Sequence, residues 1–236
     1  MIGRDALMLG RKRQAIRVKS HEYSREGLMF VKQVQVGQMA VFAYLVGDEA
    51  SGDAVVIDPA ANIDGLITEA RNNKLNIKYI VNTHGHVDHT SGNKEMREKT
   101  GALIIVHEDD AEMLANTPAM ILKMFGATAS PPADIKVKDG DDIAVGQVAL
   151  KVLHVPGHSP GSMALFYDGL VFTGDTLFVE AVGRTDLPGG SWEVMSRSIQ
   201  ERLFTLPDET KVMPGHNYGP KASSSIGHEK RYNPYL

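Results

Sequence analysis

The segment that most constrains this chain is residues 82–92, NTHGHVDHTSG, which places three histidines and an aspartate between positions 84 and 89. It follows the apolar run IKYIV, which predicts a buried strand. One histidine after a buried strand is explained by packing or by a hydrogen bond. A group of them in a loop of small residues indicates a site where side chains converge at the edge of a sheet.

The same arrangement recurs along the chain, because other histidines and aspartates also follow strand-like runs. His158 lies in VPGHSPGS, Asp175 in VFTGDT and His216 in MPGHN. Imidazole and carboxylate groups are the usual ligands of zinc, iron and manganese. The combined pattern therefore predicts a metal site, formed by His84, His86, Asp88, His89, His158, Asp175 and His216. His107 and His154 end or line strands, so we expect structural roles for both.

The remaining patterns predict a layered α/β protein, with sheets inside and helices outside. We expect strands at residues 28–37, 39–48, 53–60, 77–82, 102–107, 142–146, 148–155, 162–169, 170–175 and 210–217. We expect helices at residues 63–74, 91–101 and 191–207, and a helical segment at 107–126 that is broken around Pro118. Met113, Met120 and Met124 have the spacing of ordinary core residues, although this segment is also a candidate to overhang the site.

The amino-acid composition limits the binding partners and the cellular compartment that we expect. The chain has no cysteine, which excludes disulfides, thiolate metal ligands and a cysteine nucleophile, and fits a cytoplasmic protein. No apolar run is long enough to cross a bilayer, and the start has no signal-like apolar stretch. Residues 1–28 form a basic N-terminal extension of net charge +4, against −4 for the whole chain, so residues 29–236 carry −8. The acidic body formed by residues 29–236 argues against nucleic acid as the main substrate. Because no run could span a bilayer, we expect no membrane partner either.

Four motifs, in the order THGHVDH, PGHSPGS, FTGDTLF and PGHN, resemble those of the metallo-β-lactamase-fold superfamily over roughly residues 29–236. The resemblance implies an αββα sandwich, in which two mixed β-sheets pack face to face between helices and hold metal ions at one edge. It implies His84, His86 and His158 as ligands of a first ion. It implies Asp88, His89 and His216 for a second ion, with Asp175 bridging the two.

Three aspartates have further expected roles. Asp88 and Asp175 are the carboxylates expected at the catalytic centre. Asp58, in VVIDPA, resembles the aspartate that orients a ligand histidine in this superfamily, although an Asp-Pro turn explains it equally well.

Differences from other members of the superfamily, together with further motifs, indicate which branch this chain resembles. The chain lacks the cysteine ligand of some β-lactamases, and His86 stands where flavodiiron proteins have glutamate. Asp175, GRTDLPGGS and EKRYNPYL resemble both glyoxalase II-like hydrolases and persulfide dioxygenases. The hydrolase implies two zinc, iron or manganese ions that lower the pKa of a shared water, so that hydroxide attacks a thioester or ester. The dioxygenase implies one Fe(II) on His84, His158 and Asp175.

The stretch SPGS after His158 favours the hydrolase, which is our main expectation. Only 20 residues follow His216, whereas larger glyoxalase II proteins use a C-terminal helical domain to bind glutathione. Less favoured alternatives are an inactive metal-binding protein and a nuclease. We expect a small-molecule thioester or thiol-derived substrate, and the family often forms homodimers.

Two residues are candidates for substrate binding. Arg184 could bind a substrate carboxylate or pair with Asp186. Tyr218 could contact the substrate or pack its ring.

Overall fold

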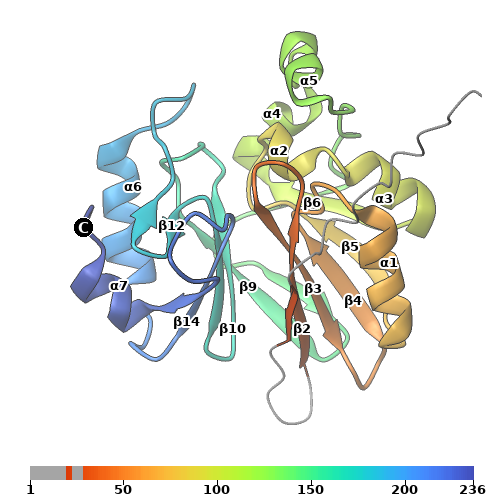
Figure 1. The fold of residues 1–236 in the computed structure, drawn as a ribbon, viewed down its shortest axis with the longest axis horizontal. Helices are drawn as coiled ribbons and strands as arrows, with labels where there is room; N and C mark the ends of the chain where they lie inside the picture. The colour runs from red at the N-terminus through yellow and green to blue at the C-terminus, as the bar shows by residue number, and fades with distance from the viewer. Residues whose placement is uncertain (1–19, 23–28) are drawn as a thin grey trace, which may run out of the picture.

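The structure is a computed structural model that describes residues 20–22 and 29–236. Within these residues two mixed sheets face each other (Figure 1). The first sheet runs in the order β1 (Ser20–Glu22), β2 (Met29–Val36), β3 (Val41–Asp48), β4 (Asp53–Ile57), β5 (Asn76–Val81), β6 (Leu103–His107) and β7 (Ile135–Val137). The second runs in the order β15 (Ser224–Ser225), β14 (Lys211–Pro214), β11 (Leu170–Gly174), β10 (Met163–Tyr167), β9 (Val148–His154) and β8 (Asp142–Val145).

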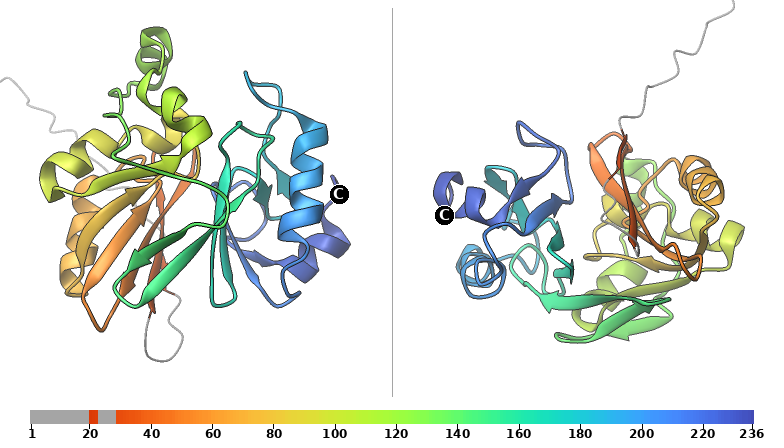
Figure 2. Two further views of the ribbon diagram at one scale, coloured as in Figure 1. Left: turned by 180° about the vertical axis from the view of Figure 1, so that it is seen from behind. Right: turned by 90° about the horizontal axis from the view of Figure 1, so that it is seen from below.

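Helices cover the outer side of each sheet, as the two further views also show (Figure 2). The first sheet is accompanied by α1 (Ile63–Asn72), α2 (Val87–Thr90), α3 (Asn93–Thr100), α4 (Ala111–Ala115) and α5 (Ala119–Phe125). The second is covered by α6 (Trp192–Ser198), which continues as a π-helical turn (Ile199–Leu203), and by α7 (Ile226–Tyr232). This arrangement confirms the predicted αββα sandwich.

The sequence of β3 explains why the sheets have helices on one side and another sheet on the other. All eight residues of this strand are buried, and successive side chains of a strand point to opposite faces. Phe42 and Tyr44 belong to the core between the sheets. Ala43 and Leu45 belong to the core beneath the helices. A strand that is apolar on both faces therefore needs a layer on each side.

The structure differs from the predicted elements where sequence patterns are short. The segment 107–126 breaks at Pro118 as predicted, but α5 has no buried residue. The side chains of Met120 and Met124 are 78% and 69% exposed, so the expectation that they belong to the core was wrong. Helices α2 and α7 and five short strands, β1, β7, β12 (Leu177–Phe178), β13 (Ala181–Val182) and β15, were not predicted.

The boundary at residue 29 stays a prediction. Three residues of the expected N-terminal extension, Ser20–Glu22, pair with β2 as the edge strand β1. The rest of that extension lies outside the described residues. Of the helices in the described part of the chain, none is both long and apolar enough to cross a membrane.

Candidate metal centre

The predicted ligands meet at one edge of the sandwich because of the strand directions. β11 pairs with β14 in parallel, and β9 runs in the same direction as β11, since β10 lies antiparallel between them. The carboxyl ends of these strands therefore lie together. His158, Asp175 and His216 follow these ends, and the loop after β5 brings in the first motif from the opposite sheet. Figure 1 shows α2, which carries Asp88 and His89, at this edge.

Two histidine loops form the first group of candidate ligands. His84, His86 and His158 offer ring nitrogens that all lie within 4.8 Å of one another. His158 Nε2 is 3.2 Å from His84 Nε2 and 2.8 Å from His86 Nδ1. Bonds of about 2.0–2.1 Å to one tetrahedral ion put neighbouring ligand atoms about 3.3 Å apart, so these separations are close to those of a metal-binding set.

The second group combines α2 with the loop after β14. Asp88, His89 and His216 also fall within 4.8 Å, and the Nε2 atoms of His89 and His216 are 3.0 Å apart. Asp175 lies between the two groups. Its Oδ1 is 3.3 Å from His89 Nε2, and its Oδ2 is 3.2 Å from His216 Nε2 and 3.7 Å from His158 Nε2.

Outer hydrogen bonds show that the inner nitrogens are the ones free to bind a cation. His158 Nδ1 lies 2.7 Å from the carbonyl oxygen of Arg184, and His216 Nδ1 lies 2.7 Å from that of Met39. A carbonyl only accepts, so each Nδ1 donates its hydrogen, and in the neutral ring Nε2 carries a lone pair. His89 Nδ1 is fixed in the same way, 3.0 Å from Asp58 Oδ2.

When the rings are neutral, these lone pairs point at each other, and two lone pairs cannot bond. A cation placed among them would satisfy them all. It would also give a partner to Asp175 Oδ1, a buried oxygen that has no hydrogen bond among the described residues. The donor set therefore fits metal ions, and the chain carries His/Asp clusters suited to them.

The pKa values of His216, His89 and Asp175 also show that positive charge is stabilised near Asp175. Burial lowers the pKa of His216, but Asp175 outweighs burial and raises it to about 9. The pKa of His89 also rises well above its usual range despite burial, because of Asp175 and Asp58. Burial would raise the pKa of Asp175, but His89 and His216 hold it well below the usual range. In the metal-free protein, protons on these two histidines occupy the position of a cation.

His84 and His86 of the first group behave differently, because burial outweighs the effect of the nearby carboxylates on their pKa values. Burial lowers the pKa of His84 well below its ordinary value, with His89 and His158 adding to the effect. Burial and then His158 lower the pKa of His86 to about 4. Both rings are therefore neutral at pH 7, as metal ligands must be.

Asp58 lies beneath the second group and is almost fully buried. Besides contacting His89, its carboxylate accepts hydrogen bonds from the Thr83 amide, at 2.9 Å, and the Thr83 hydroxyl, at 2.7 Å. The contact that one interpretation of VVIDPA requires, between Asp58 and a predicted ligand histidine, is therefore present, whereas its role in orienting a bound metal stays a prediction. Asp58 also adopts a left-handed conformation before Pro59, with φ of 48°, so the turn is present as well.

The two candidate substrate residues lie on the surface near the site. Arg184 forms a two-pronged ion pair with Asp186, with both nitrogen–oxygen distances at 2.7 Å and both side chains exposed. Tyr218 is 52% exposed, and its ring stacks on His216 with the centroids 4.5 Å apart. Burial, and then Asp175, raise the pKa of Tyr218 to about 12, so its hydroxyl stays protonated at neutral pH. Substrate binding by either residue stays a prediction.

A third histidine group does not have the geometry of a metal site. His107, Asp109 and His154 also lie within 4.8 Å. However, the two imidazole rings stack face to face, with centroids 4.0 Å apart and planes inclined by 12°. Nitrogen lone pairs lie in the ring plane, so parallel rings cannot direct them at one ion. In addition, His154 Nε2 lies 2.8 Å from the carbonyl oxygen of Pro160.

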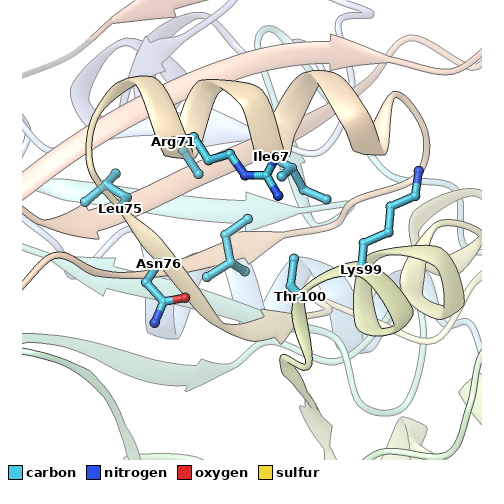
Figure 3. Close-up of a pocket in the computed structure, with 8 residues that line it drawn as sticks. Ile67, Arg71, Leu75, Asn76, Lys99 and Thr100 are labelled. Carbon is cyan, nitrogen blue, oxygen red and sulfur yellow. The ribbon is translucent and has the colours of Figure 1, made fainter.

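A hollow of about 200 Å³ between α1 and α3 is separate from this chemistry (Figure 3). It is lined by Ile67, Ala70, Arg71, Leu75, Asn76, Ile77, Lys99 and Thr100. Asn76 and Ile77 begin β5, whereas the metal motif follows the end of that strand. The hollow is smaller than typical ligand pockets of roughly 300–1,000 Å³, and its lining contains no histidine or carboxylate.

Sequence reasoning missed several groups that hold the ligands. The carbonyl oxygens of Met39 and Arg184 fix two ligand rings, but backbone acceptors leave no signal in a sequence. Asp110 is fully buried and contacts both histidine loops. Asp110 has no distinct signal in the sequence, because it stands directly after Glu108 and Asp109, two acidic residues that are exposed.

Comparisons with known proteins agree with this geometry. The human protein "Persulfide dioxygenase ETHE1, mitochondrial" is 32% identical over 231 residues, covering 94% of this chain and 83% of the human one. The crystal structure of ETHE1 from Myxococcus xanthus is 34% identical, with a TM-score of 0.75 over 86% of this chain and 83% of that one. TTHA1623, solved in a di-iron-bound form, is 32% identical, with a TM-score of 0.74 over 86% of this chain and 99% of that one.

The family pattern described as "Metallo-beta-lactamase superfamily" matches residues 36–216, which include every predicted metal ligand. The chain belongs to the metallo-β-lactamase superfamily.

Proposed function

We propose that this protein is a non-haem iron enzyme that oxidises the outer sulfur of a small-molecule persulfide with dioxygen. The observation that carries the proposal is the meeting of three ligands from three loops. His158 Nε2 lies 3.2 Å from His84 Nε2 and 3.7 Å from Asp175 Oδ2. Two histidines and one carboxylate are the set that holds Fe(II) with open coordination positions. Similarity to proteins named persulfide dioxygenases favours this chemistry over the thioester hydrolysis that we expected from the sequence.

When bound by His84, His158 and Asp175, Fe(II) would supply open coordination positions for dioxygen and for the persulfide sulfur. The chain's own residues prepare that place. The carbonyl of Arg184 orients the ring of His158, and the low pKa of Asp175 keeps its carboxylate charged at neutral pH. His86, which is neutral at pH 7 because its pKa is about 4, lies beside His158 as a further ring that does not repel the iron.

The proposed substrate carries an anionic or polar body beside its reacting sulfur. Tyr218 presents a protonated hydroxyl on a ring that is held by His216 on its face and by Phe178 at its edge. Arg184 presents a guanidinium that pairs with the exposed Asp186. A substrate carboxylate could replace Asp186 in this ion pair.

A second candidate is the dinuclear thioester hydrolase, which one specific observation favours. The second group, Asp88, His89 and His216, is complete and lies directly beside Asp175. A single Fe(II) does not need it. In this candidate Asp175 would serve as a ligand for both ions, and Asp88 would act as a catalytic carboxylate as well as a ligand. The di-iron-bound form of TTHA1623 is consistent with such a pair.

The test begins with the full chain purified without added metal. Its metal content is measured by inductively coupled plasma mass spectrometry, followed by oxygen uptake with glutathione persulfide and hydrolysis of a thioester panel. The proposal expects about one iron per chain, oxygen consumption and sulfite formation. Two ions per chain with thioester hydrolysis, and no oxygen uptake, would favour the hydrolase instead.

Two variants sharpen the distinction. Asp175→Asn should abolish activity in either case, because both metal sets include this carboxylate. His216→Gln removes a ligand of the second group only, so a mononuclear enzyme should keep its iron whereas a dinuclear one should lose an ion. His228→Gln is the matched control, since this histidine pairs with Glu180 away from the ligands.

A further inference from the structure

Asp110 is a fully buried carboxylate that lies outside every motif used to recognise the site. It ends the short helical turn Glu108–Asp110 between β6 and α4. Three donors reach it. The amide of Gly85 donates to Oδ2 at 2.7 Å, the hydroxyl of Ser159 donates to Oδ2 at 2.7 Å, and the amide of Gly161 donates to Oδ1 at 2.6 Å.

These donors come from the two loops that carry the first ligand group. Gly85 lies between His84 and His86, and Ser159 directly follows His158. The loop after β5 and the loop after β9 belong to different sheets. A single carboxylate therefore joins the two sheets at the point where their three histidines must meet.

Close packing makes this junction specific. A Cβ on Gly161 would stand 2.5 Å from the Asp110 amide nitrogen, and one on Gly85 would stand 3.0 Å from the Leu114 nitrogen. Real Cβ atoms essentially never show the first distance, and the second is tighter than nine in ten real Cβ contacts. Both loops thus lie directly against the turn that presents the carboxylate, and glycine permits the approach.

The chemistry of the three donors requires a carboxylate at this position. An ionised aspartate only accepts hydrogen bonds, so both oxygens can serve N–H and O–H donors together. Charge-assisted bonds of this kind are about twice as strong as neutral ones. Asparagine has nearly the same shape, but its NH₂ would face one of the donors and leave it without an acceptor.

We propose that Asp110 is a positioning residue that sets the metal affinity of the group His84, His86 and His158. This inference rests on the metal-dependent function proposed above. Asp58 has the corresponding place beneath the other group, where it contacts His89 and Thr83. Each ligand group thus has a buried carboxylate behind it. Asp110 contacts only the loops of the first group, whereas Asp58 also reaches that group through the Thr83 hydroxyl, which lies 3.1 Å from His84 Nδ1.

The experiment is a Co²⁺ titration of the chelator-treated full chain, followed by visible d–d absorption and by competition with a chelator of known affinity. Asp110→Asn should weaken binding at the three-histidine group by about 10–100-fold, the usual effect of losing a group that orients ligands. The spectrum of the residual complex should also change, because the ligands are less well directed. Purely structural damage would not alter the spectrum of folded, loaded protein.

The matched control is Asp48→Asn. Asp48 is also fully buried and also accepts backbone hydrogen bonds, from Gln147 at 2.8 Å and Ala50 at 3.0 Å. It ends β3 and contacts none of the ligand loops through these bonds. It should lower stability as Asp110→Asn does, but leave Co²⁺ affinity and spectrum unchanged. Wild-type affinity in Asp110→Asn, or equal weakening in Asp48→Asn, would overturn the proposal.

A second variant keeps the test decisive if Asp110→Asn does not fold. Ser159→Ala removes one donor and leaves the carboxylate in place, so it should weaken Co²⁺ binding in the same direction by a smaller factor. Unchanged binding in Ser159→Ala would then count against the proposal. Weakened binding in the variants, together with a wild type that shows neither oxygen uptake nor hydrolysis, would refute only the proposed function. A wild type that binds no Co²⁺ would refute both.

Discussion

Metal-free protein should be most stable near pH 6.5 and lose stability in both directions. On the alkaline side, the pKa of His216 is raised from 6.5 to about 9, mainly by Asp175 acting against burial. A raised pKa contributes stability that is fully present below pH 6.5 and is lost as the pH rises through 9. The difference, at 1.36 kcal/mol per pH unit, amounts to about 3 kcal/mol. His89 shifts in the same direction and adds to this loss.

On the acidic side the sign is reversed. Burial lowers the pKa of His86 from 6.5 to about 4. A depressed pKa contributes stability that is present above pH 6.5 and is lost as the pH falls through 4, again about 3 kcal/mol. Burial shifts His84 in the same direction.

Urea unfolding of chelator-treated protein at pH 4.5, 6.5 and 9 measures the loss of stability on both the acidic and the alkaline side of pH 6.5. The range stops below pH 10, because the raised pKa of Tyr218 adds its own loss of stability there. His216→Gln should reduce the loss of stability between pH 6.5 and 9, and His86→Gln should reduce the loss between pH 6.5 and 4.5. Metal-loaded protein should not show the alkaline loss, because the ion replaces the proton. Stability of the metal-free protein that rises steadily from pH 6.5 to 9 would refute this electrostatic reasoning.

Two further substitutions test the support of the site and the core separately. Asp58→Asn removes the charge beside His89 Nδ1 and should weaken Co²⁺ binding at the second group by about 10–100-fold. The three-histidine group should weaken less in the same titration, because Asp58 reaches it only through the Thr83 hydroxyl beside His84. Phe172→Ala removes a fully buried ring that meets Tyr44 edge-on between the sheets, and should cost about 3–5 kcal/mol in urea unfolding without changing the number of ions bound.

The fold could be predicted largely because several strands are apolar on both faces. The alternation in β3 demands a layer on each side, and the metal motif at the end of β5 identifies the functional edge. Elements of two or three residues, such as β12 and β15, are too short to show any period. The exposed methionines of α5 illustrate another limit. A local pattern shows that Met120 and Met124 can be buried, but not whether another element lies there to cover them.

The candidate ligands and the residues that hold them in place also differ in how far the sequence can predict them. His84, Asp175 and His216 could be identified because each follows a strand in a short motif. Asp110 could not, because its donors lie 25 residues upstream, at Gly85, and 51 residues downstream, at Gly161. Those contacts exist only once two sheets have been brought face to face. A pattern in one segment therefore identifies what can bind a metal, whereas the packing of distant segments determines how firmly it is held.

Metal binding at the second group depends most on the loop that carries His216. Asp88 and His89 both come from α2, so His216 is the only member of that group from elsewhere. The loop of His216 is tied to the turn between β2 and β3, where the Asn217 amide donates to Ala40 at 2.9 Å. The Asn217 side chain also donates to Gln35 Oε1 at 2.8 Å.

Asn217→Ala removes only that side-chain bond, whose net worth is about 0.5–1.5 kcal/mol. The second ion should therefore bind about 2- to 10-fold more weakly, whereas His84, His158 and Asp175 keep their contacts. If oxygen uptake with glutathione persulfide is unchanged in this variant while its second-site affinity falls, the second ion is not needed for turnover. Equal losses of both would mean that the two ions work together, as the hydrolase requires.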